Sequence, residues 1–168
     1  AKKTTHQQTG GGIFIGPGAD NRITHNTIYN NTSTGVVVNT TSSLANTIRQ
    51  NAIWNNASAS DATKNLGIDL GGDGITANDL KDTDTGPNNL QNYPVITSSM
   101  TKCDGTTDTK NVPMFNSTPN TTFTIDYYAN PSWDAHSGKP RQGEQWVSSE
   151  TVTTDADGNA NLNLTLIN

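Results

Sequence analysis

The segment that decides the fold is Asn21-Arg-Ile-Thr-His-Asn26-Thr-Ile-Tyr-Asn-Asn31, which recurs as Asn46-Thr-Ile-Arg-Gln-Asn51-Ala-Ile-Trp-Asn-Asn56. The two copies align without gaps at an offset of 25 residues and share six identities, four Asn pairs and two Ile pairs. Short apolar units accompany them: Gly-Ile-Phe-Ile at 12–15, Gly-Val-Val-Val at 35–38 and Gly-Ile-Asp-Leu at 67–70. A period in the twenties built from strand-like units predicts a stacked repeat.

Apolar residues alternate in each short unit, so they should share one face of a strand. This predicts the inward-facing pairs Ile13 and Ile15, Val36 and Val38, and Ile68 and Leu70. The residues between them should form an outward column of Phe14, Val37 and Asp69, and Tyr29 should stack on Trp54 one rung away. Such columns are typical of glycan or subunit contacts, and a loop of the same chain could equally cover them.

A bend must separate Ile23 from Ile28, because five residues place them out of phase for one flat strand. We place that bend at Asn26, and at Asn51 in the second copy, since Asn tolerates left-handed backbone angles. Asn side chains stacked on successive rungs can also hydrogen-bond as a ladder.

The composition agrees with a thin core. Only 30% of the residues are hydrophobic, whereas 22 are Asn and 27 are Thr, which disfavours a helical bundle. No apolar run is long enough for a transmembrane helix. The net charge of −5 and the scattered basic residues argue against a nucleic-acid partner. The single cysteine, Cys103, excludes an intrachain disulfide.

The repeats carry a resemblance. Residues 11–56 resemble the right-handed parallel β-helix of the pectate-lyase-like superfamily, and residues 66–95 resemble a segment that closes β-helices in large bacterial and archaeal surface proteins. The resemblance implies an all-β chain: a β-helix of about three rungs with an acidic, Gly-rich closing segment over 1–92, then an immunoglobulin-like antiparallel β-sandwich over 93–168.

Period-two alternation supports that second half. We expect strands at 93–98, near Val112, and at 122–129, 145–148, 151–154 and 161–167, with a turn at 155–159. These are about six strands where such a sandwich needs about seven. We therefore expect the last strand to be missing and the open edge to pair with another chain; residues 1–9 are a weaker donor candidate. The first rung should likewise pack on a neighbour.

Closely spaced carboxylates mark the closing segment, among Gly71, Gly72, Gly74 and Gly86. Carboxylate oxygens on a Gly-rich loop are the ligands that calcium prefers, although no EF-hand spacing is present. The alternative is a turn-rich cap whose carboxylates bond backbone amides. The predicted metal ligands are Asp69, Asp73, Asp79, Asp82 and Asp84.

No catalytic constellation supports an enzyme. The outer-face candidates His25, Arg22, Arg49 and Asp69 include no carboxylate pair, and Glu does not occur before Glu144. Sequons for N-glycosylation occur at Asn30, Asn31, Asn39, Asn56, Asn116, Asn120 and Asn163.

These observations favour a non-enzymatic structural or adhesive module, secreted or at the cell surface, that self-associates or contacts neighbouring segments of a larger protein. The alternative is a fragment of a β-helix protein that binds or degrades polysaccharides. An ice-binding solenoid is a third option, weakened by the lack of a regular Thr-x-Thr column.

Overall fold

The computed structural model describes residues 11–56, 66–95, 114–130 and 142–162. These residues form strands and one 3-10 helix, and no α-helix occurs among them, which confirms the predicted all-β class. The elements are β1 (Ile13–Ile15), β2 (Arg22–Thr24), β3 (Thr27–Tyr29), β4 (Val36–Val38), β5 (Thr47–Arg49), β6 (Ala52–Trp54), β7 (Ile68–Leu70), η1 (Pro87–Leu90), β8 (Met114–Asn116), β9 (Thr122–Ala129), β10 (Gln145–Thr153) and β11 (Asn159–Asn161).

The described residues fall into two compact units. The first comprises those within Ala1–Ala77, Asp84–Leu90 and Asp126–Ser148, and the second those within Asn78–Thr83, Gln91–Ile125 and Ser149–Asn168. This division does not coincide with the boundary at residue 92 expected from sequence. The closing segment is shared, and the distal parts of β9 and β10 group with the repeats.

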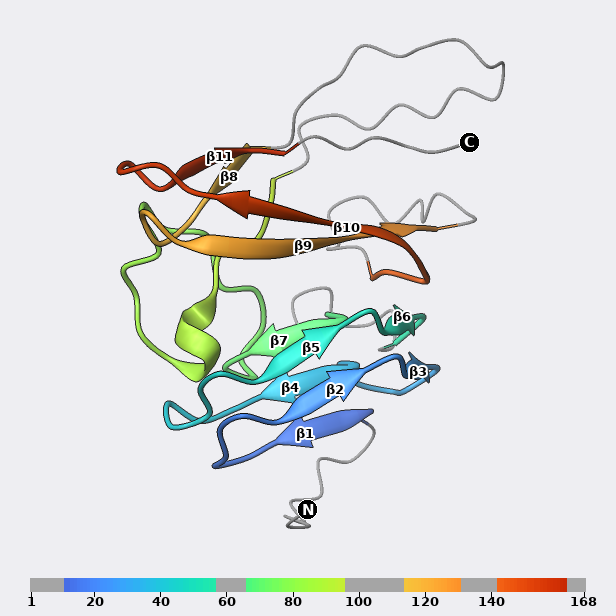
Figure 1. Cartoon of the computed structure of the whole chain (residues 1–168). Coiled ribbons are helices and arrows are strands. Elements are labelled where there is room, and N and C mark those ends of the chain that lie inside the picture. Colours follow the sequence, from blue (N-terminus) through green and yellow to red (C-terminus); the bar gives the residue numbers. More distant parts are fainter. Residues whose placement is uncertain (1–10, 57–65, 96–113, 131–141, 163–168) are drawn as a thin grey trace, which may run out of the picture. The chain divides into compact units, whose positions relative to one another are not determined.

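Parallel strands stack in three columns in the first unit (Figure 1). One column is β1-β4-β7, the second is β2-β5 and the third is β3-β6. Ile23 pairs with Ile48 and Ile28 pairs with Ile53 across the rungs. The register is therefore the 25-residue offset of the sequence alignment, and the short parallel β-helix is confirmed.

The core of this unit is a narrow aliphatic strip. Its buried members are Ile15, Ile23, Ile28, Val36, Val38 and Ile53, with Ile13, Ile48 and Leu70 packed against them. Ile68 departs from the expected pattern, because its side chain is 41% exposed although its backbone pairs with Val36. It lies in β7, which has no further strand beside it among the described residues, so no next rung covers its side chain.

The Asn ladder forms at three corners of the stack. At the middle corner, the backbone N–H and the Nδ2 of Asn26 both donate to Oδ1 of Asn51, at 2.9 and 3.1 Å. Asn21 donates in the same way to Asn46, and Asn31 to Asn56. Asn46, Asn51 and Asn56 are buried, so these bonds form away from water.

The left-handed backbone does not lie at the ladder Asn residues, as we expected, but one position earlier. Positive φ angles occur at 20, 25 and 30 in the first rung and at 45, 50 and 55 in the second, for example 58° at His25 and 54° at Gln50. The corner is thus a left-handed residue followed by Asn. Asn26 and Asn51 act through their amides, and their neighbours absorb the bend.

Chain segments distant in sequence continue the ladder beyond the second rung. Oδ1 of Asn88 accepts from the backbone N–H of Asn46 at 2.9 Å. Oε1 of Gln142 accepts from the backbone N–H and Nδ2 of Asn56, at 3.1 and 2.9 Å. Both groups are primary amides, so each supplies the oxygen that a third-rung Asn would offer.

The second unit contains antiparallel pairing. β8 pairs antiparallel with β11, and Val95 makes an isolated bridge to Met114. β9 and β10 form a separate two-stranded sheet, and only part of each strand belongs to this unit. Phe115, Val152 and Leu162 are its buried core. The predicted strand at 122–129 is confirmed, whereas the two strands predicted at 145–148 and 151–154 are one strand, β10, which ends at Thr153.

Several predicted features lie outside the described residues: Cys103, the strand near Val112, the donor segment 1–9, and most of the strand at 161–167. The immunoglobulin-like topology and the missing strand therefore stay predictions.

Candidate functional site

The outward column has the predicted register, but only part of it is exposed. Phe14 pairs with Val37 and Val37 with Asp69 across β1, β4 and β7. Val37 is 2% exposed and Asp69 is 3% exposed, so neither side chain is open to a glycan or a second subunit. Gly72 explains the burial of Val37, because a Cβ at position 72 would lie 3.1 Å from Cγ1 of Val37. The loop after β7 therefore covers this face.

The carboxylate of Asp69 organises that loop. Its Oδ1 accepts from the backbone N–H of Gly72 at 3.0 Å, and its Oδ2 accepts from that of Gly74 at 3.2 Å. Burial raises the pKa of Asp69, and these hydrogen bonds from the backbone oppose that rise. Both carboxylate oxygens thus bond backbone amides, which is the turn-forming role that the sequence left as the alternative to calcium.

Tyr29 and Trp54 form the exposed part of the outer surface. Their ring centroids are 4.8 Å apart and their planes differ by 13°, as expected for side chains on paired rungs. Tyr29 is 48% exposed. Beside them, Nδ2 of Asn55 donates to Oδ1 of Asn30 at the next corner position. An aromatic stack with amide groups at its edge is a surface that can contact sugar rings or another protein.

Three of the predicted metal ligands lie together in one loop. Carboxylate oxygens of Asp79, Asp82 and Asp84 lie within 4.8 Å of one another. Asp69 and Asp73 are not in this group, so the structure separates the five predicted ligands into two sets. Oxygen atoms at this spacing on one short loop suit a hard cation.

Hydrogen bonds within the second unit hold that loop. Oδ2 of Asp82 accepts from the hydroxyl of Ser117 at 2.7 Å, and Oδ1 accepts from the backbone N–H of Asn92 at 3.0 Å. Oδ2 of Asp79 accepts from the backbone N–H and the hydroxyl of Thr83, at 2.9 and 2.7 Å. The carboxylates of Asp79 and Asp82 therefore have structural partners in the protein itself.

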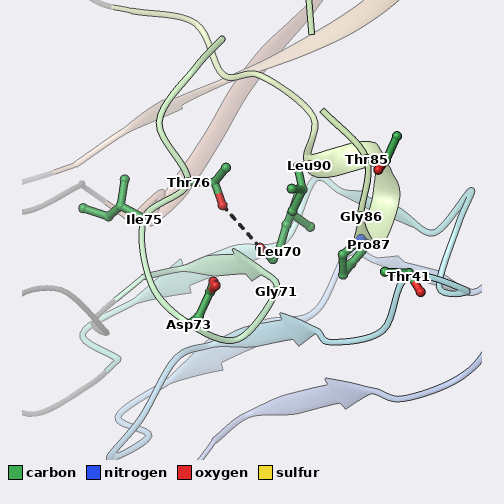
Figure 2. A pocket seen from close by; sticks show the side chains of 10 residues that line it. All are labelled: Thr41, Leu70, Gly71, Asp73, Ile75, Thr76, Thr85, Gly86, Pro87 and Leu90. Atoms are coloured by element: carbon green, nitrogen blue, oxygen red, sulfur yellow. Dashed lines mark hydrogen bonds between the residues drawn. The ribbon is translucent and has the colours of Figure 1, made fainter. Parts of the chain in front are cut away.

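A pocket of about 390 Å³ lies between the end of β7, the loop at 71–76 and η1 (Figure 2). Leu70, Pro87 and Leu90 provide apolar walls, and Asp73 and Thr76 are among its polar groups. The hydroxyl of Thr76 donates to the carbonyl of Leu70 at 3.5 Å. No sequence pattern indicated this pocket, because three separate segments of the chain build it.

Residues 2–105 match the family model described as a right-handed β-helix region, which covers more than half of the chain. The chain belongs to the right-handed β-helix family. A comparison with curated proteins gives no match. Across the described residues of this β-helix protein, no helix has the length and apolar character needed to cross a membrane.

Two of the four candidate catalytic residues of this β-helix protein have structural roles, and the other two are exposed on the first rung. Nε of Arg49 donates to Oδ2 of Asp126 at 3.1 Å, and this hydrogen bond raises the pKa of Arg49. Asp69 bonds the amides of its own loop. Arg22 and His25 are exposed on the first rung, and His25 adopts a left-handed backbone conformation at the corner.

The sequons differ in accessibility. Asn30, Asn39 and Asn120 are exposed. Asn56 is 3% exposed, and its Nδ2, the atom that would carry a glycan, donates to the carbonyl of Ile28 at 2.8 Å. Asn56 is therefore not a glycan acceptor in the folded β-helix. The remaining sequons are Asn31, which lies in the ladder, Asn116, which bonds Asp157 and Asn159, and Asn163, which is outside the described residues.

Proposed function

We propose that this β-helix protein is a non-enzymatic, extracellular structural or adhesive module that self-associates through open strand edges. The observation that carries the proposal is the first-rung edge. Strands β1, β2 and β3 each have a neighbour on one side only among the described residues. Unpaired strand edges favour addition of another strand.

The first-rung corners support the same proposal. Asn21 and Asn26 are exposed, whereas their second-rung partners Asn46 and Asn51 are buried. The first rung thus presents amide groups that become buried wherever a rung stacks on another. Of the outer-face candidates, Arg49 bonds Asp126 and Asp69 bonds the amides of its own loop, which favours a structural role over an enzymatic one.

Sedimentation velocity over a range of protein concentrations tests the self-association. We expect concentration-dependent oligomers that Thr27→Lys weakens, because Thr27 is exposed on the edge strand β3 and edge lysines oppose strand pairing. Ser42→Lys, at an exposed position in the turn between β4 and β5, is the control outside any strand edge and should leave the oligomers unchanged. A wild-type chain that stays monomeric at every concentration overturns the proposal.

Calcium binding at the loop of Asp79, Asp82 and Asp84 is part of this proposal, because their oxygens converge within 4.8 Å. Isothermal titration with CaCl₂ should give a saturable signal that Asp84→Asn abolishes and Asp73→Asn leaves in place. Absence of heat in the wild type, or equal loss in both variants, counts against a calcium site at this loop.

The stacked pair Tyr29 and Trp54 favours a second candidate, a polysaccharide-binding β-helix protein. Its test is retention on immobilised neutral and acidic polysaccharides. Tyr29→Ala should release the protein, whereas Phe14→Ala, an aromatic substitution on another column of the same rung, should not. Turnover of acidic polysaccharide by the wild type would overturn the non-enzymatic assignment.

A further inference from the structure

We propose that the pocket between β7, the loop at 71–76 and η1 binds an aliphatic primary ammonium group, the chemistry of a lysine side chain. The pocket lies within the first unit, and the proposal does not depend on the self-association proposed above. Its volume of about 390 Å³ is in the lower part of the range of small-molecule sites, roughly 300–1,000 Å³. A ligand of a few carbon atoms with one charged end therefore fits.

The walls favour an aliphatic stem. Leu70 is the last residue of β7, and Pro87 and Leu90 belong to η1. Leu90 packs over Gly86, where an added Cβ would lie 2.7 Å from Cγ of Leu90. Among the described residues, no aromatic ring lines the pocket, and these residues therefore offer no flat platform on which a sugar ring usually stacks. The methylene groups of a lysine-like stem are stabilised by contact with such aliphatic walls.

The polar groups select a cation. Asp73 is the charged side chain of the lining, and the hydroxyls of Thr41, Thr76 and Thr85 add further acceptor oxygens. In Figure 2 the carboxylate of Asp73 points into the curve of its loop, toward the end of β7. Gly71, with φ of 118°, allows this position, since a Cβ there would lie 2.7 Å from Oδ1 of Asp73.

The charge also excludes an acidic ligand. A carboxylate accepts hydrogen bonds from an ammonium group and repels a uronate or phosphate. The net charge of −5 for the chain acts in the same direction. The ligand that this pocket prefers therefore has the opposite charge to an acidic polysaccharide.

NMR titration of the full chain tests the proposal, with the methyl signals of Leu70, Thr76 and Leu90 as reporters. The probe is Nα-acetyl-lysine methylamide, and Nε-acetylation of the same compound removes the charge but keeps the stem. We expect saturable shifts with the charged probe, binding weaker by roughly two- to fivefold with the acetylated probe, as for one exposed ion pair, and no shifts with galacturonate. n-Butylammonium separates the two sources of such a group: equal affinity points to a free amine, and weaker affinity to a lysine within a peptide.

Asp73→Asn should lower the affinity for the charged probe by the same factor. Asp20→Asn, which changes an exposed Asp of the same unit outside the pocket, should leave that affinity unchanged. Added salt should weaken wild-type binding without any substitution, which keeps the test independent of folding of the variant. Equal binding of the charged and acetylated probes, or binding of galacturonate at these methyl groups, overturns the proposal.

Discussion

Replacing Asn51 by Ala tests whether buried ladder amides hold the rungs together. Oδ1 of Asn51 accepts from the backbone N–H and from Nδ2 of Asn26, at 2.9 and 3.1 Å, and its Nδ2 donates to the carbonyl of Ile23 at 2.8 Å. Asn51 is 2% exposed, so water does not replace these partners after the substitution. The carbonyl of Ile23 then loses a buried hydrogen bond, and the backbone N–H and Nδ2 of Asn26 lose their acceptor.

The expected cost follows from those three bonds. Each contributes about 0.5–1.5 kcal/mol net, so Asn51→Ala should lower the free energy of unfolding by roughly 3 kcal/mol. Asn26→Ala is the matched control on the exposed rung. It removes the bonds from its Nδ2 to Asn51 and to the carbonyl of Thr24, but water reaches that corner, so we expect a loss of about 1 kcal/mol.

Urea unfolding, followed by tryptophan fluorescence and circular dichroism, measures the two losses. Trp54 lies in β6 directly after this corner, so its fluorescence reports on the first unit. Hydrogen exchange provides a local readout, because Asn51→Ala should remove protection of the Asn26 backbone N–H. If Asn51→Ala lowers the free energy of unfolding no more than Asn26→Ala does, or if the Asn26 amide stays protected, the buried ladder amides do not hold the rungs together.

Three further substitutions address other parts of the first unit. Gly35→Ala places a Cβ 2.7 Å from the carbonyl oxygen of Gly67, so it should lower stability by about 1–3 kcal/mol in a urea titration, and an unchanged midpoint would contradict this close approach. Burial raises the pKa of Asp69, so its contribution to stability is present below its ordinary value near 3.8 and is lost as pH rises through the higher folded-state value. As the pH rises above about 3.8, the free energy of unfolding of the wild type should therefore fall relative to that of Asp69→Asn. Parallel pH profiles of the two proteins would contradict this role of Asp69. Gln142→Ala removes the acceptor of Asn56, so hydrogen exchange at the Asn56 backbone N–H should accelerate, and unchanged exchange would show that Gln142 does not close the column.

The repeating part of the fold could be predicted from sequence because equivalent positions of successive rungs hold similar residues. A 25-residue offset that aligns Ile23 with Ile48 and Tyr29 with Trp54 fixes the register, the inward side and the aromatic stack at once. Parallel stacking places identical positions side by side, so one alignment determines many contacts. The Asn ladder followed from the same alignment.

Contacts that a loop makes with the strands were not predictable in this way. Val37 is outward in register yet buried, because the loop at Gly72 returns over it. Asp69 belongs to that loop and bonds its amides, so its carboxylate does not join Asp79, Asp82 and Asp84. A return of a loop onto a strand depends on backbone geometry that residue spacing does not encode.

At the corners, the sequence did not predict which residue takes the left-handed backbone conformation. Asn is the residue that a sequence rule assigns to positive φ, yet His25 and Gln50 adopt it, and the adjacent Asn residues form the ladder. The strong requirement is for an amide that offers donors to one rung and an acceptor to the other. The residue before each ladder Asn then adopts the left-handed conformation, which is the smaller energetic penalty.

The hydrogen bonds between the paired Asn residues of the ladder all run in one direction along the stack. In each column the earlier Asn donates and the later amide accepts, so the closing end needs acceptor oxygens. Asn88 and Gln142 provide them from segments far along the chain, which explains why primary amides stand there. At the opposite end, the oxygens of the first-rung Asn residues are the acceptors that a preceding rung would use. A partner that stacks there must therefore bring N–H donors at the three corners, and a rung with Asn in the same positions does so.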